Sequence, residues 1–271
     1  MNKCCFQNLA MVVSDVCNMN CAHCLHGKKE RRKMSDEVIE ATLEQTLALG
    51  TLSICGGELT LALDRLESII DYLIEHHIYL THLTATINGT IYSEEMIRLF
   101  EEINNYIGAE SVRAFFSISI DKYHIDEMKR LNIIDEFGEN IQKYKESKYF
   151  YDFRTIDKKL LCEGNAQYLD NNLTIPLIPI KHYITYVNSN LKFDKEHGRC
   201  EIGPLVTINQ AGVITECDAS TIHQRTVYNY GNVLNGSIEK QLLENNAIVL
   251  PPKRYLRACN KEVKRWNNYN G

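Results

Sequence analysis

Residues 9–25 have the sequence Leu-Ala-Met-Val-Val-Ser-Asp-Val-Cys-Asn-Met-Asn-Cys-Ala-His-Cys-Leu, in which an apolar run is closely followed by Cys17, Cys21 and Cys24. The apolar run predicts a buried strand, and the cysteines fall on the loop after it. Iron-sulfur cubanes are normally held by four cysteine thiolates. A compact loop with three cysteines and no fourth nearby therefore predicts a cubane with one open iron, which can bind and cleave another molecule.

A zinc site is the alternative for these cysteines. Structural zinc takes four tetrahedral ligands, usually from paired Cys-x2-Cys units, and the chain has only one such unit. His23 and His26 would complete four ligands on paper, but ligands crowded between residues 17 and 26 leave no framework to close around the ion. The spacing therefore favours a cluster over zinc.

Length and composition restrict the class of protein. The 271 residues, 44% of them hydrophobic, fit one large α/β domain or one such domain with a small extension. The net charge of −5 argues against a nucleic-acid partner, which requires a dense positive surface. The one basic cluster, residues 28–33, is short and is expected to form a solvated loop edge. No apolar stretch is long enough to span a bilayer, so no membrane partner is expected.

The chain contains ten cysteines, which is many for its length. A secreted disulfide-rich protein would begin with a signal peptide, but the first residues lack a basic region followed by a long apolar core. We therefore expect a cytoplasmic protein, whose reduced cysteines are available to bind metal.

Apolar runs alternate with helix-period segments along the chain, which is the pattern of parallel βα units. Strands are expected at residues 9–13, 52–55, 83–87, 112–120 and 149–153, and within 175–187. One helix is expected to start after Ser35, to carry Leu47 on its buried face and to end before Gly50. Three more are expected over 66–73, between Ser93 and Gly108, and over 125–144. Six repeats predict an α/β fold, a partial, TIM-like (β/α)6 barrel with its active-site loops at the carboxyl ends of the strands.

Unusual segments follow three of these strands. The Gly-Gly-Glu segment at 56–58 would let the backbone approach a ligand closely, and its carboxylate suits an ammonium group. Asn88-Gly89 follows the third strand, where the helix that comes next contradicts a hairpin turn. Ser119 and Asp121 alternate to the same face at the end of the fourth strand, so both can face a ligand.

In their order along the chain, these motifs resemble the radical S-adenosylmethionine (radical SAM) superfamily, whose signature is Cys-x3-Cys-x-aromatic-Cys after the first barrel strand. The resemblance implies that Cys17, Cys21 and Cys24 ligate a 4Fe-4S cluster whose open iron chelates SAM, and that one electron cleaves SAM to a 5′-deoxyadenosyl radical. His23 takes the aromatic position, and Leu59 replaces the proline of the family's Gly-Gly-Glu-Pro motif. The residues implied for SAM binding here are His23, Gly56, Gly57, Glu58, Asn88, Ser119 and Asp121.

The segment Gly164-Asn165-Ala166 resembles the Gly-Arg-Ala segment of peptide-modifying radical SAM enzymes. The resemblance adds Asn165 to the expected cofactor contacts, although an arginine-specific contact is not expected. Cys162, just before it, is a candidate catalytic hydrogen-atom donor, as a thiol is in radical epimerases. The alternative is a buried hydrophobe, which is the commoner role of a single cysteine.

The carboxyl-terminal residues resemble the SPASM and twitch extensions, which hold auxiliary clusters. Cys200, Gly212 and Cys217 have the spacings of those extensions, residues 205–215 predict a β-hairpin, and residues 230–238 resemble a Gly-Asn-Ile segment leading into a helix. Downstream only Cys259 remains, fewer cysteines than either extension needs. A second cluster would use Cys200, Cys217, Cys259 and a distant ligand. The candidates for that ligand are Cys4, Cys5, Cys162 and His197. The alternative is an extension that has kept its fold and lost its metal.

We expect a radical SAM core over residues 1–190 and a small α+β extension over 191–271. The first hypothesis is an oxidoreductase-like enzyme that modifies a ribosomally synthesised peptide. No room precedes Leu9 for a leader-recognition domain, so the barrel or a separate protein would hold that peptide. The second is a dehydrogenase or epimerase of a small sugar, aminocyclitol or nucleotide, and either enzyme would need an electron donor such as flavodoxin or ferredoxin. The third is a non-enzymatic iron-sulfur or zinc-binding module.

Overall fold

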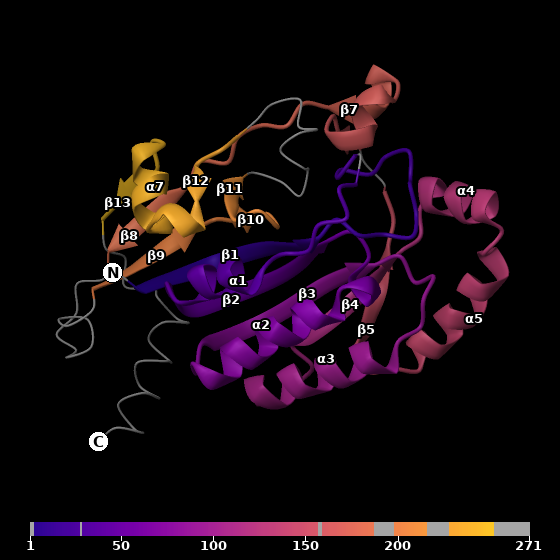
Figure 1. Cartoon of the computed structure of the whole chain (residues 1–271), viewed down its shortest axis with the longest axis horizontal. Coiled ribbons are helices and arrows are strands. Elements are labelled where there is room, and N and C mark those ends of the chain that lie inside the picture. The colour runs from indigo at the N-terminus through magenta and orange to yellow at the C-terminus, as the bar shows by residue number, and fades with distance from the viewer. Residues whose placement is uncertain (1–2, 28, 157–158, 187–197, 216–227, 252–271) are drawn as a thin grey trace.

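The computed structural model describes residues 3–27, 29–156, 159–186, 198–215 and 228–251. Its centre is a run of five parallel strands, β1 to β5, with the bounds Lys3–Ser14, Thr46–Gly56, Tyr79–Ile87, Ala114–Ser119 and Phe150–Arg154. The helices that connect them are α1 (Asp36–Leu43), α2 (Leu63–Glu75), α3 (Glu94–Ile107), α4 (Lys122–Leu131) and α5 (Ile134–Lys145). Helices α2 and α3 lie side by side on one face of the sheet (Figure 1). The predicted α/β class and TIM-like partial barrel are confirmed.

The helices attach to the sheet through the apolar faces that their sequences predict. In α2, the buried residues are Leu66, Ile69, Ile70 and Leu73, each at most 1% exposed. Their spacing gives one apolar stripe, and each buried side chain contributes about 1.5–3 kcal/mol. Helix α3 starts at the predicted cap, where the Ser93 hydroxyl accepts a hydrogen bond from the Met96 N–H.

Two predicted helix boundaries are wrong. Leu47 and Gly50 belong to β2, because α1 ends at Leu43 and pairing with β1 begins at Thr46, opposite Cys4. Hydrogen bonds to a neighbouring strand override local helical periodicity there. The helix expected over 125–144 is divided into α4 and α5 at Asn132, whose left-handed backbone (φ 55°) ends α4.

Strands from the carboxyl-terminal region flank β1 on its other side. Both β9 (Arg199–Gly203) and β10 (Val206–Ile208) pair parallel to β1. With β11 (Val213–Thr215), β10 forms the predicted antiparallel hairpin, and β12 (Gly231–Asn232) extends it. Helix α7 (Ile238–Glu244) follows. The strands described after residue 198 therefore share one sheet with the barrel strands.

A regular βα repeat would place the sixth expected strand beside β5, but the structure places it elsewhere. It is β8 (Tyr183–Tyr186), which pairs antiparallel to β9 and parallel to β13 (Ile248–Leu250) instead of beside β5. Between β5 and β8, the strands β6 (Leu160–Leu161) and β7 (Thr174–Ile175) form a separate small sheet. Short 3-10 helices span Leu59–Leu61, Gly164–Tyr168, Asn171–Leu173 and Val233–Asn235. Within the described residues, we find no helix with the length and apolar character that crossing a membrane requires.

Candidate active site

The carboxyl ends of the first four strands surround a cavity of about 400 Å³. Parallel barrels place their active sites at this edge of the sheet. Most of the predicted site residues line the cavity: Cys17, Cys21, His23, Cys24, Gly56, Gly57, Asn88 and Ser119. Residues 156, 160 and 161, all Ile or Leu, add an apolar wall.

The three cysteines lie on a loop that leaves β1 and returns beside it. Asp15, which is fully buried, holds the returning segment: its Oδ2 accepts a hydrogen bond from the Glu30 N–H (2.7 Å) and its Oδ1 one from the Arg32 N–H (2.5 Å). Hydrogen bonds to a carboxylate are among the stronger ones in proteins. The buried side chain of Asp15 therefore connects the two ends of the cysteine loop.

The donor set of the cysteine loop decides which group fits it. Cys17, Cys21 and Cys24 all line the cavity. Structural zinc takes four protein ligands, whereas three thiolates can hold three irons of an iron-sulfur cubane. Three thiols that open onto one cavity therefore fit a cluster with one open iron.

Asn88, at the end of β3, connects the cysteine loop to the sheet. Its Nδ2 lies 3.8 Å from the Cys17 sulfur and donates to Asn18 Oδ1 at 2.9 Å. Its backbone N–H donates to Glu58 Oε2 at 2.7 Å. One residue thus contacts a predicted iron ligand and the carboxylate of the Gly-Gly-Glu segment.

Glu58 is 1% exposed, deeper than the sequence implies. Its Oε1 accepts hydrogen bonds from the backbone and hydroxyl of Thr60, while Oε2 accepts the one from Asn88. Burial raises the pKa of Glu58 above its ordinary value, although these hydrogen bonds oppose the rise. The carboxylate therefore joins the ends of β2 and β3, beneath the glycines that line the cavity.

Gly56 and Gly57 let two backbone segments approach each other closely. A Cβ on Gly56, where φ is +141°, would lie 2.2 Å from the Ser14 carbonyl oxygen, and one on Gly57 would lie 2.1 Å from that of Val16. The backbone N–H of Gly57 donates to Ser14 at 2.6 Å. These glycines therefore allow the start of the cysteine loop to contact the end of β2.

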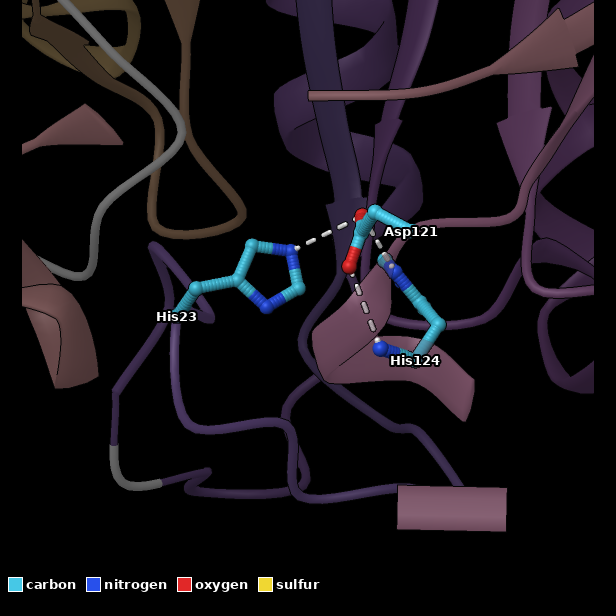
Figure 2. A group of neighbouring side chains, drawn as sticks. All are labelled: His23, Asp121 and His124. Carbon is cyan, nitrogen blue, oxygen red and sulfur yellow. Dashed lines mark hydrogen bonds and ion pairs between the residues drawn. The ribbon is translucent and has the colours of Figure 1, made fainter. Parts of the chain in front are cut away.

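Asp121 organises two histidines at the rim of the cavity. Figure 2 shows the His23 ring pointing toward the Asp121 carboxylate, with Oδ2 lying 3.5 Å from His23 Nε2 and 2.7 Å from His124 Nδ1. Asp121 Oδ1 caps α4 by accepting from the N–H groups of Tyr123 and His124. Both carboxylate oxygens are thus engaged by neighbouring groups, whereas the buried Nδ1 of His23 has no hydrogen-bond partner.

The His23 ring also stacks on Tyr123, with centroids 4.8 Å apart. Burial lowers the pKa of His23 to about 4, against the opposing attraction of Asp121. A neutral aromatic ring therefore occupies the position in the cysteine motif where an aromatic residue is expected.

Asn165 contacts the cysteine loop itself. Its backbone N–H donates to the Cys24 carbonyl at 2.8 Å and its Nδ2 to the Cys21 carbonyl at 3.0 Å. The neighbouring Gly164 has a φ of +57°, and a Cβ there would lie 2.1 Å from the Leu25 carbonyl oxygen. The Gly-Asn-Ala segment thus packs against the predicted cluster loop, and the contact of Asn165 with the cofactor stays a prediction.

Cys162 is 4% exposed and lines a separate cavity of about 440 Å³, together with residues such as Glu163 and Thr174. It is not among the residues that line the main cavity. Cys55 lines the main cavity instead. The burial of Cys162 agrees with the hydrophobe alternative, and its role as a hydrogen-atom donor stays a prediction.

Cys200 lies at the opposite end of β1 from the cavity. It is fully buried on β9, opposite Cys4 of β1, with the two sulfurs 3.6 Å apart. The contact with Cys4 and burial both raise the pKa of Cys200. Cys217, Cys259 and His197 lie outside the described residues.

Three residues at the site were not predicted. Lys29 lines the cavity, although the basic cluster was expected to be a solvated edge; for Lys29 that expectation is wrong. Glu127 of α4 accepts a hydrogen bond from the Asn20 N–H at 2.9 Å and pairs with Arg130 at 2.7 Å. His124, three residues after Asp121, had the only sequence signal, because that spacing brings two side chains to one side of a helix start.

Comparison with protein families matches residues 11–154 to the Radical SAM superfamily. Among solved structures, the chain is similar to the one described as native anSMEcpe with bound AdoMet and Cp18Cys peptide, with a TM-score of 0.50, 16% identity, and coverage of 89% of this chain and 81% of that one. Streptococcus suis SuiB bound to S-adenosylmethionine gives a TM-score of 0.41 and 11% identity, with coverage of 87% and 65%. A comparison with curated proteins gives no match.

The family match covers more than half of the chain and includes the cysteine loop, the Gly-Gly-Glu segment, Asn88 and Asp121. The structural match to anSMEcpe supports the same fold over most of the chain. The chain therefore belongs to the radical SAM superfamily, whose members use a 4Fe-4S cluster and S-adenosylmethionine.

Proposed function

We propose that this chain is an oxidoreductase-like radical SAM enzyme that modifies a ribosomally synthesised peptide. The observation that carries the proposal is the cavity at the strand ends, which Cys17, Cys21 and Cys24 line together with Gly56 and Gly57. When bound, the cluster and SAM supply the radical that removes a hydrogen atom from the substrate. The cluster would take its electron from a donor such as flavodoxin or ferredoxin.

The residues of this chain would bind, orient and shield that chemistry. The three cysteines would hold three irons, and the hydrogen bonds from Asn88 and Asn165 would fix their loop. Ser119 and His23 would contact SAM from the cavity wall. The apolar residues at 156, 160 and 161 would exclude water from the reacting atoms.

Two features support a peptide as the substrate. The Gly-Asn-Ala segment resembles that of peptide-modifying relatives, and the anSMEcpe structure, which has the same fold, contains a bound peptide. We further propose that residues 1–190 form the catalytic core and that residues 191–271 are a shortened SPASM- or twitch-like extension. The hairpin of β10 and β11 supports the extension.

The test is anaerobic reconstitution with iron and sulfide, followed by measurement of 5′-deoxyadenosine under a strong reductant. The wild-type protein should cleave SAM, and the variant with Cys17, Cys21 and Cys24 all changed to alanine should not. Circular dichroism of the variant checks that the fold is retained. Formation of 5′-deoxyadenosine by the triple variant would contradict the assignment of these cysteines as the cluster ligands.

The substrate class is tested separately. Short peptides encoded beside the gene, and a panel of sugars, aminocyclitols and nucleotides, are incubated with the active enzyme and analysed by mass spectrometry. A mass change in a peptide supports the proposal. A change confined to a small molecule would replace it with the dehydrogenase or epimerase alternative, which the cavity volume of about 400 Å³ also accommodates.

A further inference from the structure

Lys29 reaches from the returning segment of the cysteine loop into the cavity that the three cysteines line. Its ammonium donates a hydrogen bond to the carbonyl oxygen of Met19. Met19 lies between Cys17 and Cys21, and its own N–H donates to the Cys17 sulfur at 3.4 Å. The hydrogen bond of Lys29 therefore holds a positive charge beside the sulfurs.

Two carboxylates also lie near the cysteine loop. Glu127 accepts a hydrogen bond from the Asn20 N–H, next to Cys21. Glu58 accepts one from Asn88, whose Nδ2 lies 3.8 Å from the Cys17 sulfur. Of the described residues that line the cavity, Lys29 is the only lysine or arginine.

We propose that Lys29 is a positioning residue that holds a positive charge against the cysteine side of the 4Fe-4S cluster and thereby raises the reduction potential of the cluster. Reduction adds one negative charge to a centre already bound by thiolates. The potentials of iron-sulfur clusters depend on net charge and on hydrogen bonds around the sulfurs. A nearby cation stabilises the added electron, and partial burial limits the screening of its charge. The inference rests on the family's cluster and is independent of the substrate.

The test compares the midpoint potential of the reconstituted enzyme with those of three variants, by redox titration followed by electron paramagnetic resonance without SAM. Lys29→Gln retains a donor for the Met19 carbonyl but carries no charge, whereas Lys29→Arg retains the charge. Lys33→Gln is the matched control, because Lys33 belongs to the same basic cluster but pairs with Asp64 at 2.7 Å, away from the cavity. Iron content is measured on every sample.

We expect Lys29→Gln to shift the midpoint to more negative potential, with Lys29→Arg and Lys33→Gln remaining within the scatter of the parent. A parental midpoint in Lys29→Gln, or an equal shift in Lys33→Gln, overturns the proposal. If Lys29→Gln binds too little iron to titrate, the iron content of Lys29→Arg decides. An iron content equal to that of the parent supports the role of the charge, whereas loss of iron in both variants overturns the proposal.

Discussion

Glu58 has protein donors on both carboxylate oxygens, Asn88 on one and Thr60 on the other. Hydrogen bonds to a charged group are worth about 1.5–3 kcal/mol, which offsets part of the cost of burying the charge. Glu58 directly follows the two glycines that line the cavity, and the family resemblance assigns its carboxylate to the SAM ammonium. The same side chain would then stabilise the strand ends and attract the cofactor.

We therefore expect Glu58→Gln to weaken SAM affinity by roughly ten- to a hundredfold, the loss of one charge-assisted contact of about 1.5–3 kcal/mol. SAM titration measures the affinity, and iron analysis verifies that the cluster is retained. Glu67→Gln, on the outer surface beside Arg98, is the matched control. An unchanged SAM titration in Glu58→Gln would remove Glu58 from the cofactor site.

The parts of the site that lie within short motifs were predictable from the sequence. Spacing alone places Cys17 and Gly56 at a cavity wall once their strands are known. Lys29 and Glu127 were not predictable, because nothing local distinguishes them from solvated charges. Their contacts with Met19 and Asn20 depend on how the loop folds back and where α4 lies.

The 3-10 helix at Gly164–Tyr168 attaches to the cysteine loop through backbone contacts that tolerate little change. Gly164→Ala would place a side chain in a left-handed conformation, at a cost of about 1–2 kcal/mol, and directly against the Leu25 carbonyl. We expect this variant to lose the Asn165 contacts to the loop and to retain less iron after gel filtration.

Gly138→Ala is the matched control for this variant. Gly138 lies in α5 with no neighbouring atom within 4 Å of an added Cβ. Alanine there should raise the unfolding free energy by about 0.5–1 kcal/mol and leave iron unchanged. Equal iron retention in Gly164→Ala and Gly138→Ala would show that the 3-10 helix does not support the cluster loop.

The helices with strong caps and apolar stripes were predicted well. The errors lie where pairing with a distant segment determines the bounds or the neighbour of a strand. The Ser93 cap and the buried stripe of α2 are local signals. The start of β2 depends on the register with β1, and the neighbour of β8 depends on β9. The residues around β2 and β8 carry no information about these partner strands, so local sequence patterns could not predict the pairing.

In the whole molecule, β1 holds the barrel and the carboxyl-terminal strands together, since it pairs with β2 on one side and with β9 and β10 on the other. Gln7 of β1 adds a side-chain hydrogen bond at 2.5 Å to Glu201 of β9. Burial raises the pKa of Glu201, against the opposing hydrogen bond from Gln7. The contribution of this carboxyl to stability is therefore complete below its ordinary pKa of 4.5 and is lost as pH rises through the raised value.

Glu201→Gln remains neutral at every pH and can still accept the hydrogen bond from Gln7. We expect the variant to exceed the parent in stability at pH 7, by up to roughly 1 kcal/mol, and to match it near pH 4. Denaturant unfolding at both pH values measures the difference, with the exposed Glu110→Gln as control. A stability difference that does not depend on pH would contradict this account.

The carboxyl-terminal cysteines determine whether the molecule carries one cluster or two. We predict a second cluster held by Cys200, Cys217, Cys259 and one distant ligand. Wild-type protein should then contain clearly more iron than a single cubane needs. The Cys200, Cys217 and Cys259 triple alanine variant should fall to the iron content of one cluster.

The opposite result has an equally definite meaning. The triple variant would then leave the iron and sulfide content and the electron paramagnetic resonance of the reduced protein unchanged. In that case the cysteines are buried small hydrophobes, and only the unfolding free energy should fall. The distinction bears on the reaction. A second cluster favours an oxidation that must dispose of an electron, whereas a single cluster favours a redox-neutral change such as epimerisation, for which a thiol donor such as Cys162 or Cys55 would then be required.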